Sequence, residues 1–93
     1  MTIELTDTQR QIKKECDQIA ALLITKNAAY GNSFSEPINI FSRQTPEEQL
    51  KIRIDDKLNR LAKGSTFQNE DTILDLVGYL ILLRVLDNQR RGA

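Results

Sequence analysis

The sequence predicts an all-α protein: a three-helix protomer with a packed loop between its first two helices, assembling into an oligomeric helical bundle. Apolar residues recur at helical spacing in three segments, and each segment begins with residues that typically cap a helix. The third segment is apolar nearly all round, and two other helices of the same chain cannot easily cover such a helix. A second protomer packing against it is the simplest remedy, which predicts a homo-oligomer.

The first helix is expected to begin after a capping box of Thr6 and Gln9 and to run to about Ala29. One narrow face of this helix carries Ile12, Cys16, Ile19 and Leu23. The same face continues into Lys26 and Tyr30, so both side chains are expected to point inward.

Residues 32–44 combine turn formers with large apolar residues. Pro37 favours a break in regular structure. The apolar residues are Phe34, Ile38, Ile40 and Phe41. A free linker would not carry them, so a loop packed onto the core is expected. Long loops of this kind in a compact domain are more often functional than idle.

The second helix has a clear predicted start, with Thr45 as the cap, Pro46 at the first helical position and Glu48 three residues after the cap. Its predicted buried stripe consists of Leu50, Ile54, Leu58 and Leu61. Gly64 is expected to end this helix.

The third helix is predicted to be capped by Asn69 and to run to about Asn88, with Glu70 and Asp71 in its first turn, where the helix dipole favours anions. Between positions 73 and 86 only three residues are not apolar, namely Asp75, Gly78 and Arg84. The whole chain of 93 residues is expected to form one domain, with frayed ends at 1–6 and 89–93.

Composition excludes several functional classes. Lys and Arg total 13 and Asp and Glu total 13, so neither direct DNA binding nor a polybasic membrane anchor is expected. Cys16 is the single cysteine and there is no histidine, which excludes an internal disulfide and histidine-dependent catalysis. The polar N-terminus lacks the apolar region of a signal peptide, and no stretch reaches the roughly 20 apolar residues of a membrane span, so a cytoplasmic location is expected.

Two polar clusters suggest an anionic ligand. At the end of the first helix, Lys26 and Tyr30 stand beside a glycine turn and could hold a phosphate and a base, or simply complete the helix end. On the second helix, Arg53, Lys57 and Arg60 share one arc beside the buried stripe. Asp56 lies on the same arc, so ordinary ion pairing along the helix is the simpler interpretation of this second cluster taken alone.

A third cluster is acidic. Asp71 and Asp75 lie on one face of the third helix, and a carboxylate on so apolar a helix is costly unless it is paired or bound to a metal. Glu48 or Asp55 could complete an oxygen site for magnesium. Alternatively, an arginine of the second helix, Arg53 or Arg60, could neutralise Asp75, and this interpretation is preferred.

Three blocks of the sequence resemble a known family. They are Lys26-x-x-x-Tyr30-Gly31-Asn32-Ser33-Phe34, Arg53-Ile54-Asp55-Asp56-Lys57-x-x-Arg60-Leu61 and Glu70-Asp71-x-x-x-Asp75-x-x-Gly78-Tyr79. In this order they look like the phage and prophage family called nucleotide-modification-associated domain 1. The resemblance implies a link to nucleotide metabolism. The acidic helices also loosely resemble the all-α NTP pyrophosphatases, which hold magnesium with clustered carboxylates, although no helix here shows a Glu-x-x-Glu pair.

These observations together favour a small phage-type protein that binds a nucleotide or nucleotide-derived phosphate between helices or subunits, and that could sequester a host nucleotide immune signal. The expected ligand-binding residues are Lys26, Tyr30, Asn32, Phe34, Arg53, Asp56, Lys57, Arg60, Asp75 and Tyr79. Such a binder needs no cofactor. The alternative is a magnesium-dependent nucleotide pyrophosphohydrolase, with Glu48, Asp55, Asp71 and Asp75 as metal ligands. A purely structural or protein-interaction bundle is the second alternative.

Overall fold

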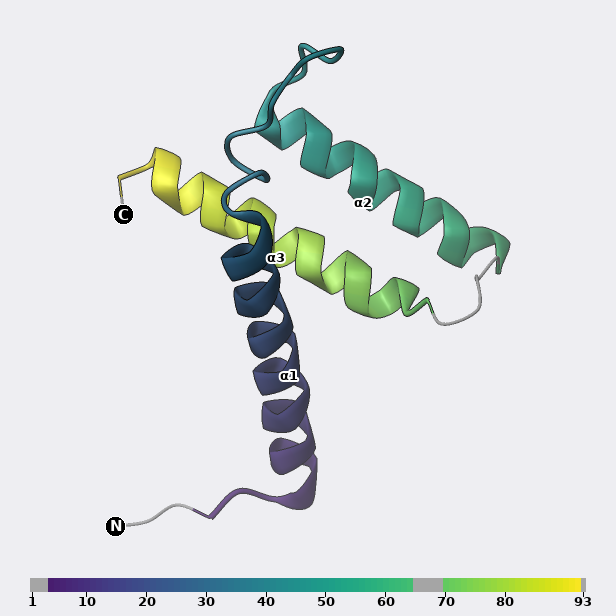
Figure 1. Ribbon diagram of the computed structural model, residues 1–93. Coiled ribbons are helices and arrows are strands. Elements are labelled where there is room, and N and C mark those ends of the chain that lie inside the picture. Colours follow the sequence, from purple (N-terminus) through teal and green to yellow (C-terminus); the bar gives the residue numbers. More distant parts are fainter. Residues whose placement is uncertain (1–3, 65–69, 93) are drawn as a thin grey trace. The chain divides into compact units, whose positions relative to one another are not determined.

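The computed structural model describes residues 4–64 and 70–92 and contains three α-helices, with no strand in these ranges (Figure 1). The helices are α1 (Asp7–Tyr30), α2 (Pro46–Lys63) and α3 (Thr72–Arg90). The predicted all-α class and the number of helices are therefore confirmed. In the described part of the chain, no helix is long and apolar enough to cross a membrane.

The chain divides into two compact units, Met1–Gly31 and Asn32–Ala93. The first unit contains α1, and the second contains the 32–45 segment with α2 and α3. The single domain predicted from the sequence stays a prediction.

The capping box at the start of α1 is present as predicted. The backbone N–H of Gln9 donates to Thr6 Oγ1 at 3.2 Å, and the backbone N–H of Thr6 donates to Gln9 Oε1 at 3.0 Å. The helix ends at Tyr30, and Gly31 follows with φ +68°, a backbone conformation that residues with a side chain rarely adopt.

The predicted buried face of α1 is wrong. None of its residues is buried, Ile12 is 58% exposed and Tyr30 is 76% exposed, and Lys26 is exposed as well. The physical reason is that a single helix makes up the regular structure of its unit, so no neighbouring helix of that unit covers its apolar stripe.

The start and end of α2 match the prediction. The backbone N–H of Glu48 donates to Thr45 Oγ1 at 3.2 Å, and the Glu48 carboxylate accepts from the backbone N–H of Thr45 at 3.3 Å. Pro46 occupies the first helical turn, where a missing N–H costs nothing. Gly64 ends the helix in the left-handed conformation, with φ +65°.

The start of α3 differs from the prediction by two residues. Asp71 is the cap, because its Oδ1 accepts from the backbone N–H of Leu74 at 2.9 Å. Asn69, the predicted cap, lies outside the described residues. The helix continues to Arg90, so Gln89 and Arg90 are helical rather than frayed.

Helices α2 and α3 lie side by side and antiparallel in the second unit (Figure 1). Its buried apolar residues are Leu50 (2% exposed) and Ile54 (9%) from α2 and Leu86 (2%) from α3. The other two members of the predicted α2 stripe are not buried, since Leu58 is 48% and Leu61 is 39% exposed. The core of the hairpin is thus concentrated where the first half of α2 faces the second half of α3.

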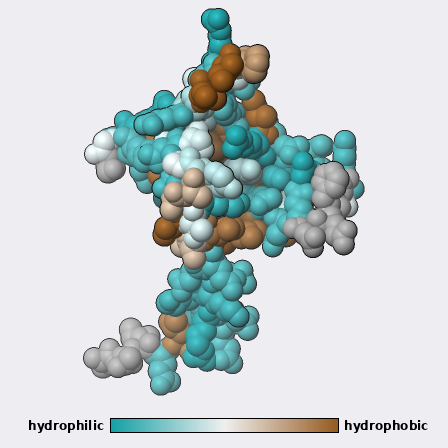
Figure 2. Space-filling model, viewed as in Figure 1, coloured by the Kyte–Doolittle hydropathy of each residue, from teal (hydrophilic) through white to brown (hydrophobic). Residues whose placement is uncertain are grey.

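The 32–44 segment is not packed onto the core as predicted. Ile38, Ile40 and Phe41 are exposed, Phe41 completely, and Figure 2 shows hydrophobic side chains at the surface of the segment that precedes α2. Phe34 is half-buried. The backbone hydrogen bonds of this segment are local, because Ser35 and Glu36 both donate to the Asn32 carbonyl. A hairpin core of so few buried residues offers little surface to cover these side chains.

Candidate functional site

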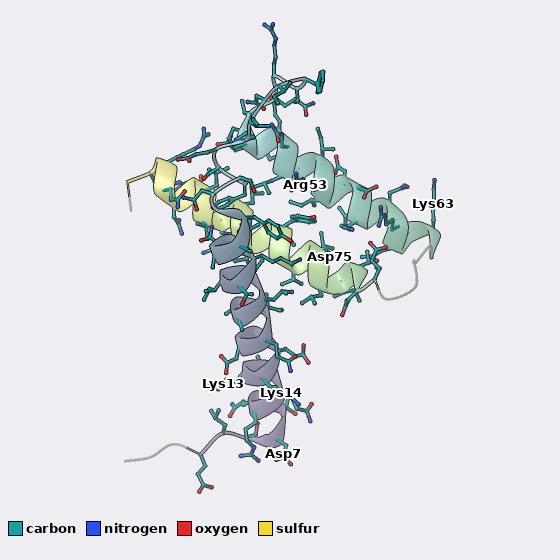
Figure 3. All side chains as sticks on the ribbon, viewed as in Figure 1. Asp7, Lys13, Lys14, Arg53, Lys63 and Asp75 are labelled. Carbon is teal, nitrogen blue, oxygen red and sulfur yellow. The ribbon has the colours of Figure 1, made fainter. Side chains whose placement is uncertain are left out.

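Polar and aromatic side chains from α2 and from residues 70–79 face each other in antiparallel register. Arg53, Lys57 and Arg60 lie on one side of α2, because residues four and three apart share a helix face. Their partners are Tyr79, Asp75 and Glu70, in that order. These six residues form the charged stripe. Figure 3 labels Arg53 and Asp75, which belong to its α2 and α3 sides.

Glu70 lies at the centre of the ionic part of the stripe. Lys57 Nζ donates to Glu70 Oε1 at 2.8 Å, and Arg60 Nη1 donates to the same oxygen. The side chains of Lys57 and Glu70 are only 11% and 14% exposed. A single carboxylate oxygen therefore accepts hydrogen bonds from two cations in a place with little access to water.

The contact between Lys57 and Glu70 shifts the pKa of both side chains. The hydrogen bond from Lys57, followed by the charge of Arg60, holds the pKa of Glu70 below its usual value despite its partial burial. The hydrogen bond to Glu70, supported by Asp75, raises the pKa of Lys57. Both residues are therefore charged at neutral pH.

Asp75 is compensated by a cation, but not by either of the arginines that were expected. Its Oδ2 lies 3.3 Å from Lys57 Nζ. Arg60 contacts Glu70 and lies 3.2 Å from Asp56 Oδ2, one turn before it. Arg53 lies one turn further along, over Tyr79. The antiparallel register thus places Lys57, the middle one of the three cations, beside Asp75. The predicted pairs of Asp75 with Arg53 and with Arg60 are wrong.

Arg53 has a different environment from the other two cations. Its guanidinium carbon lies 5.9 Å from the centre of the Tyr79 ring, within the range of a cation–π interaction. In the range of residues that the structure describes, no carboxylate lies within ion-pair distance of Arg53. Arg53 is exposed and Tyr79 is half-buried, so the guanidinium keeps hydrogen-bond donors available to solvent.

The cluster predicted at the end of α1 is divided between the two units. Lys26 and Tyr30 belong to α1, whereas Asn32 and Phe34 belong to the second unit. The Asn32 carbonyl accepts hydrogen bonds within its own turn. A shared role of these four residues with the charged stripe stays a prediction.

The four acidic residues suggested as magnesium ligands have separate structural positions. Glu48 completes the capping box of α2, Asp71 caps α3, Asp75 contacts Lys57, and Asp55 is exposed. Within residues 4–64 and 70–92, no three carboxylate or cysteine side chains come together in a way that could hold a metal ion. In the single chain these residues do not form the predicted oxygen site.

Charges on α1 form local pairs at the surface instead. Lys13 lies 2.6 Å from Asp17, with both side chains about two-thirds exposed, and this contact raises the pKa of Lys13. Asp7 pairs with Arg10 in the first turn; Figure 3 labels Asp7 and Lys13. Exposed pairs of this kind contribute little to stability or binding.

Glu70 is the residue of the site that sequence reasoning missed. It was assigned to the first turn of α3 as a partner of the helix dipole, whereas it precedes the helix and reaches α2. The third block of the family resemblance begins with Glu70, and this was the one feature of the sequence that pointed to a role for the residue. Comparison of the chain with known protein families, curated proteins and solved structures found no match, so that resemblance stays a prediction.

Proposed function

We propose that this protein binds a nucleotide-type ligand at the charged stripe, with Arg53 contacting a phosphate and Tyr79 supporting the base. The observation that carries the proposal is the exposed guanidinium over the Tyr79 ring, without a carboxylate partner among the described residues. An arginine in this position offers a planar set of donors that matches phosphate oxygens. The adjacent ring offers an apolar surface to an aromatic base.

The remaining predicted ligand residues extend this proposal. The charge around the ligand would be set by three residues of the stripe, Lys57, Arg60 and Asp75, and by Asp56 beside it. Lys26, Tyr30, Asn32 and Phe34 stay predicted ligand residues on the sequence pattern alone. The family resemblance suggests a phage or prophage protein in the bacterial cytoplasm, where a binder of this kind would sequester a host nucleotide signal.

We also propose that the binding unit is a homo-oligomer. Several apolar residues of α3 remain exposed in the single chain: Ile73 (63%), Leu80 (44%), Ile81 (36%) and Val85 (36%). Exposed apolar surface of this kind on a small helical protein favours association. The ligand pocket would then be completed by a second copy.

The experiment that tests ligand binding is mass spectrometry of the purified full chain after incubation with a mixture of mononucleotides, dinucleotides and cyclic nucleotides, with and without magnesium. Retention of an unchanged nucleotide, lost in Arg53→Gln and kept in Arg84→Gln, supports the binder. Arg84 is a suitable control because it is an exposed arginine on α3 outside the stripe.

Two other outcomes would replace the proposal. Magnesium-dependent conversion of a nucleotide would indicate the pyrophosphohydrolase. If neither wild type nor Arg53→Gln retains a nucleotide and the protein forms a stable oligomer, the result would indicate a structural or protein-interaction bundle.

A further inference from the structure

The two cations nearest the start of α3 are arranged as in an anion-binding site, and a side chain of the protein occupies it. Lys57 Nζ and Arg60 Nη1 both donate to one oxygen, Glu70 Oε1. Charged donors that converge on one oxygen bind carboxylate and phosphate oxygens alike. The low exposure of Lys57 and Glu70 strengthens the electrostatic interaction at this point.

The local charge balance prevents an external anion from simply joining this cluster. Among the described residues, Lys57 and Arg60 contact the carboxylates of Asp56, Glu70 and Asp75. An added phosphate would bring further negative charge to a group that already carries more anions than cations. It can bind there only if one carboxylate leaves or is neutralised.

Glu70 is the carboxylate that can leave. Among the described residues, Glu70 is the carboxylate that contacts both cations, whereas Asp56 contacts Arg60 and Asp75 contacts Lys57. Rotation of the Glu70 side chain would therefore release both cations together. Asp56 still lies beside Arg60, and Asp75 beside Lys57, after this rotation.

We propose that Lys57 and Arg60 form a phosphate-binding site that the Glu70 carboxylate occupies in the ligand-free protein, and that a bound phosphate displaces it. This inference rests on the proposed function, because the site lies on the same stripe as Arg53. Lys57 is one helical turn from Arg53, which places the two positions about 6 Å apart along the helix. Glu70 thereby acts as an internal competitor that weakens ligand binding.

The test uses inorganic pyrophosphate as the probe and isothermal titration calorimetry of the full chain. Glu70→Gln removes the competing charge but keeps an oxygen that can accept from both cations. It should bind pyrophosphate at least about tenfold more tightly than wild type, as expected when a charge-assisted hydrogen bond no longer competes. Glu36→Gln removes the same charge from an exposed position and should leave the affinity unchanged. Adding Lys57→Gln to Glu70→Gln should abolish the gain.

A second measurement needs no substitution. The carboxyl resonance of Glu70 in wild type, followed by NMR through an acid titration, should report a higher pKa with saturating pyrophosphate than without it, since the carboxylate has left its cations. An unchanged Glu70 titration, or a folded Glu70→Gln variant with wild-type affinity, would overturn the inference. Nucleotide retention that depends on Arg53 would still stand in that case. A gain in Glu70→Gln without Arg53-dependent retention would instead overturn the proposed function alone.

Discussion

Glu70 and Lys57 form a contact of 2.8 Å between the segment before α3 and the middle of α2, with both side chains largely shielded from water. The contact joins residues that are 13 positions apart, so it stabilises the hairpin rather than one helix. At the other end of the hairpin, Arg90 pairs with Glu47 at 2.7 Å. The few buried apolar residues of the hairpin thus lie between these two ion pairs.

The first prediction concerns the coupling between Lys57 and Glu70. Lys57→Met should lower the melting temperature more than Lys13→Met, because it leaves Glu70 with one cation fewer in a poorly hydrated position. A double-mutant cycle with Glu70→Gln should give a larger coupling free energy than a cycle of Lys13→Met with Asp17→Asn. Lys13–Asp17 is the matched control because its contact of 2.6 Å is also short, while both of its side chains are well exposed. Equal couplings would mean that burial adds nothing to the Glu70 contact.

The second prediction concerns pH. The folded-state pKa of Glu70 is lowered from 4.5, so its contribution to stability is present above that value and is lost as pH falls through the lowered pKa. The pKa of Lys57 is raised from 10.5, so its contribution is present below that value and is lost as pH rises through the raised pKa. Thermal unfolding followed by circular dichroism should show both losses in wild type. The acid loss should shrink in Glu70→Gln; the same acid loss in both proteins would contradict the assignment.

The third prediction concerns the core of the hairpin. Leu50→Ala should reduce the free energy of unfolding by about 2–5 kcal/mol, because Leu50 is 2% exposed and its truncation leaves a cavity. Leu58→Ala should cost less than about 1 kcal/mol, since Leu58 is 48% exposed in the same helix. Urea unfolding measures both. A large effect of Leu58→Ala would contradict this difference and would show that another surface covers Leu58 in solution.

Local chemistry allowed the helix ends to be predicted from the sequence. The capping boxes of Thr6 with Gln9 and of Thr45 with Glu48 involve residues three apart, and no distant contact is needed to form them. The start of α3 was harder to predict because both Asn69 and Asp71 belong to residue types that cap helices. The structure assigns the cap to Asp71.

The pairing within the charged stripe could not be predicted, because it depends on how far α2 and α3 are shifted along each other. Arg53, Lys57 and Arg60 share one arc, and of these three cations only Arg53 and Arg60 were expected to pair with Asp75. The observed register gives that role to Lys57. The apolar face of α1 shows the same difficulty, since a periodic stripe predicts that a face can be buried but does not identify the element that covers it.

The last prediction concerns the proposed homo-oligomer. Leu80 is 44% exposed on α3, and a charge placed there would have to be desolvated if a second copy covers this face. Leu80→Glu should therefore shift the protein toward monomer, as measured by light scattering at micromolar concentration. Asn88→Glu adds the same charge to an exposed position near the end of α3 and should leave the assembly unchanged. If dissociation also abolishes nucleotide retention while circular dichroism shows intact helices, the ligand site needs two copies. A wild-type monomer would contradict the oligomer, and retention by that monomer would locate the whole site on one chain.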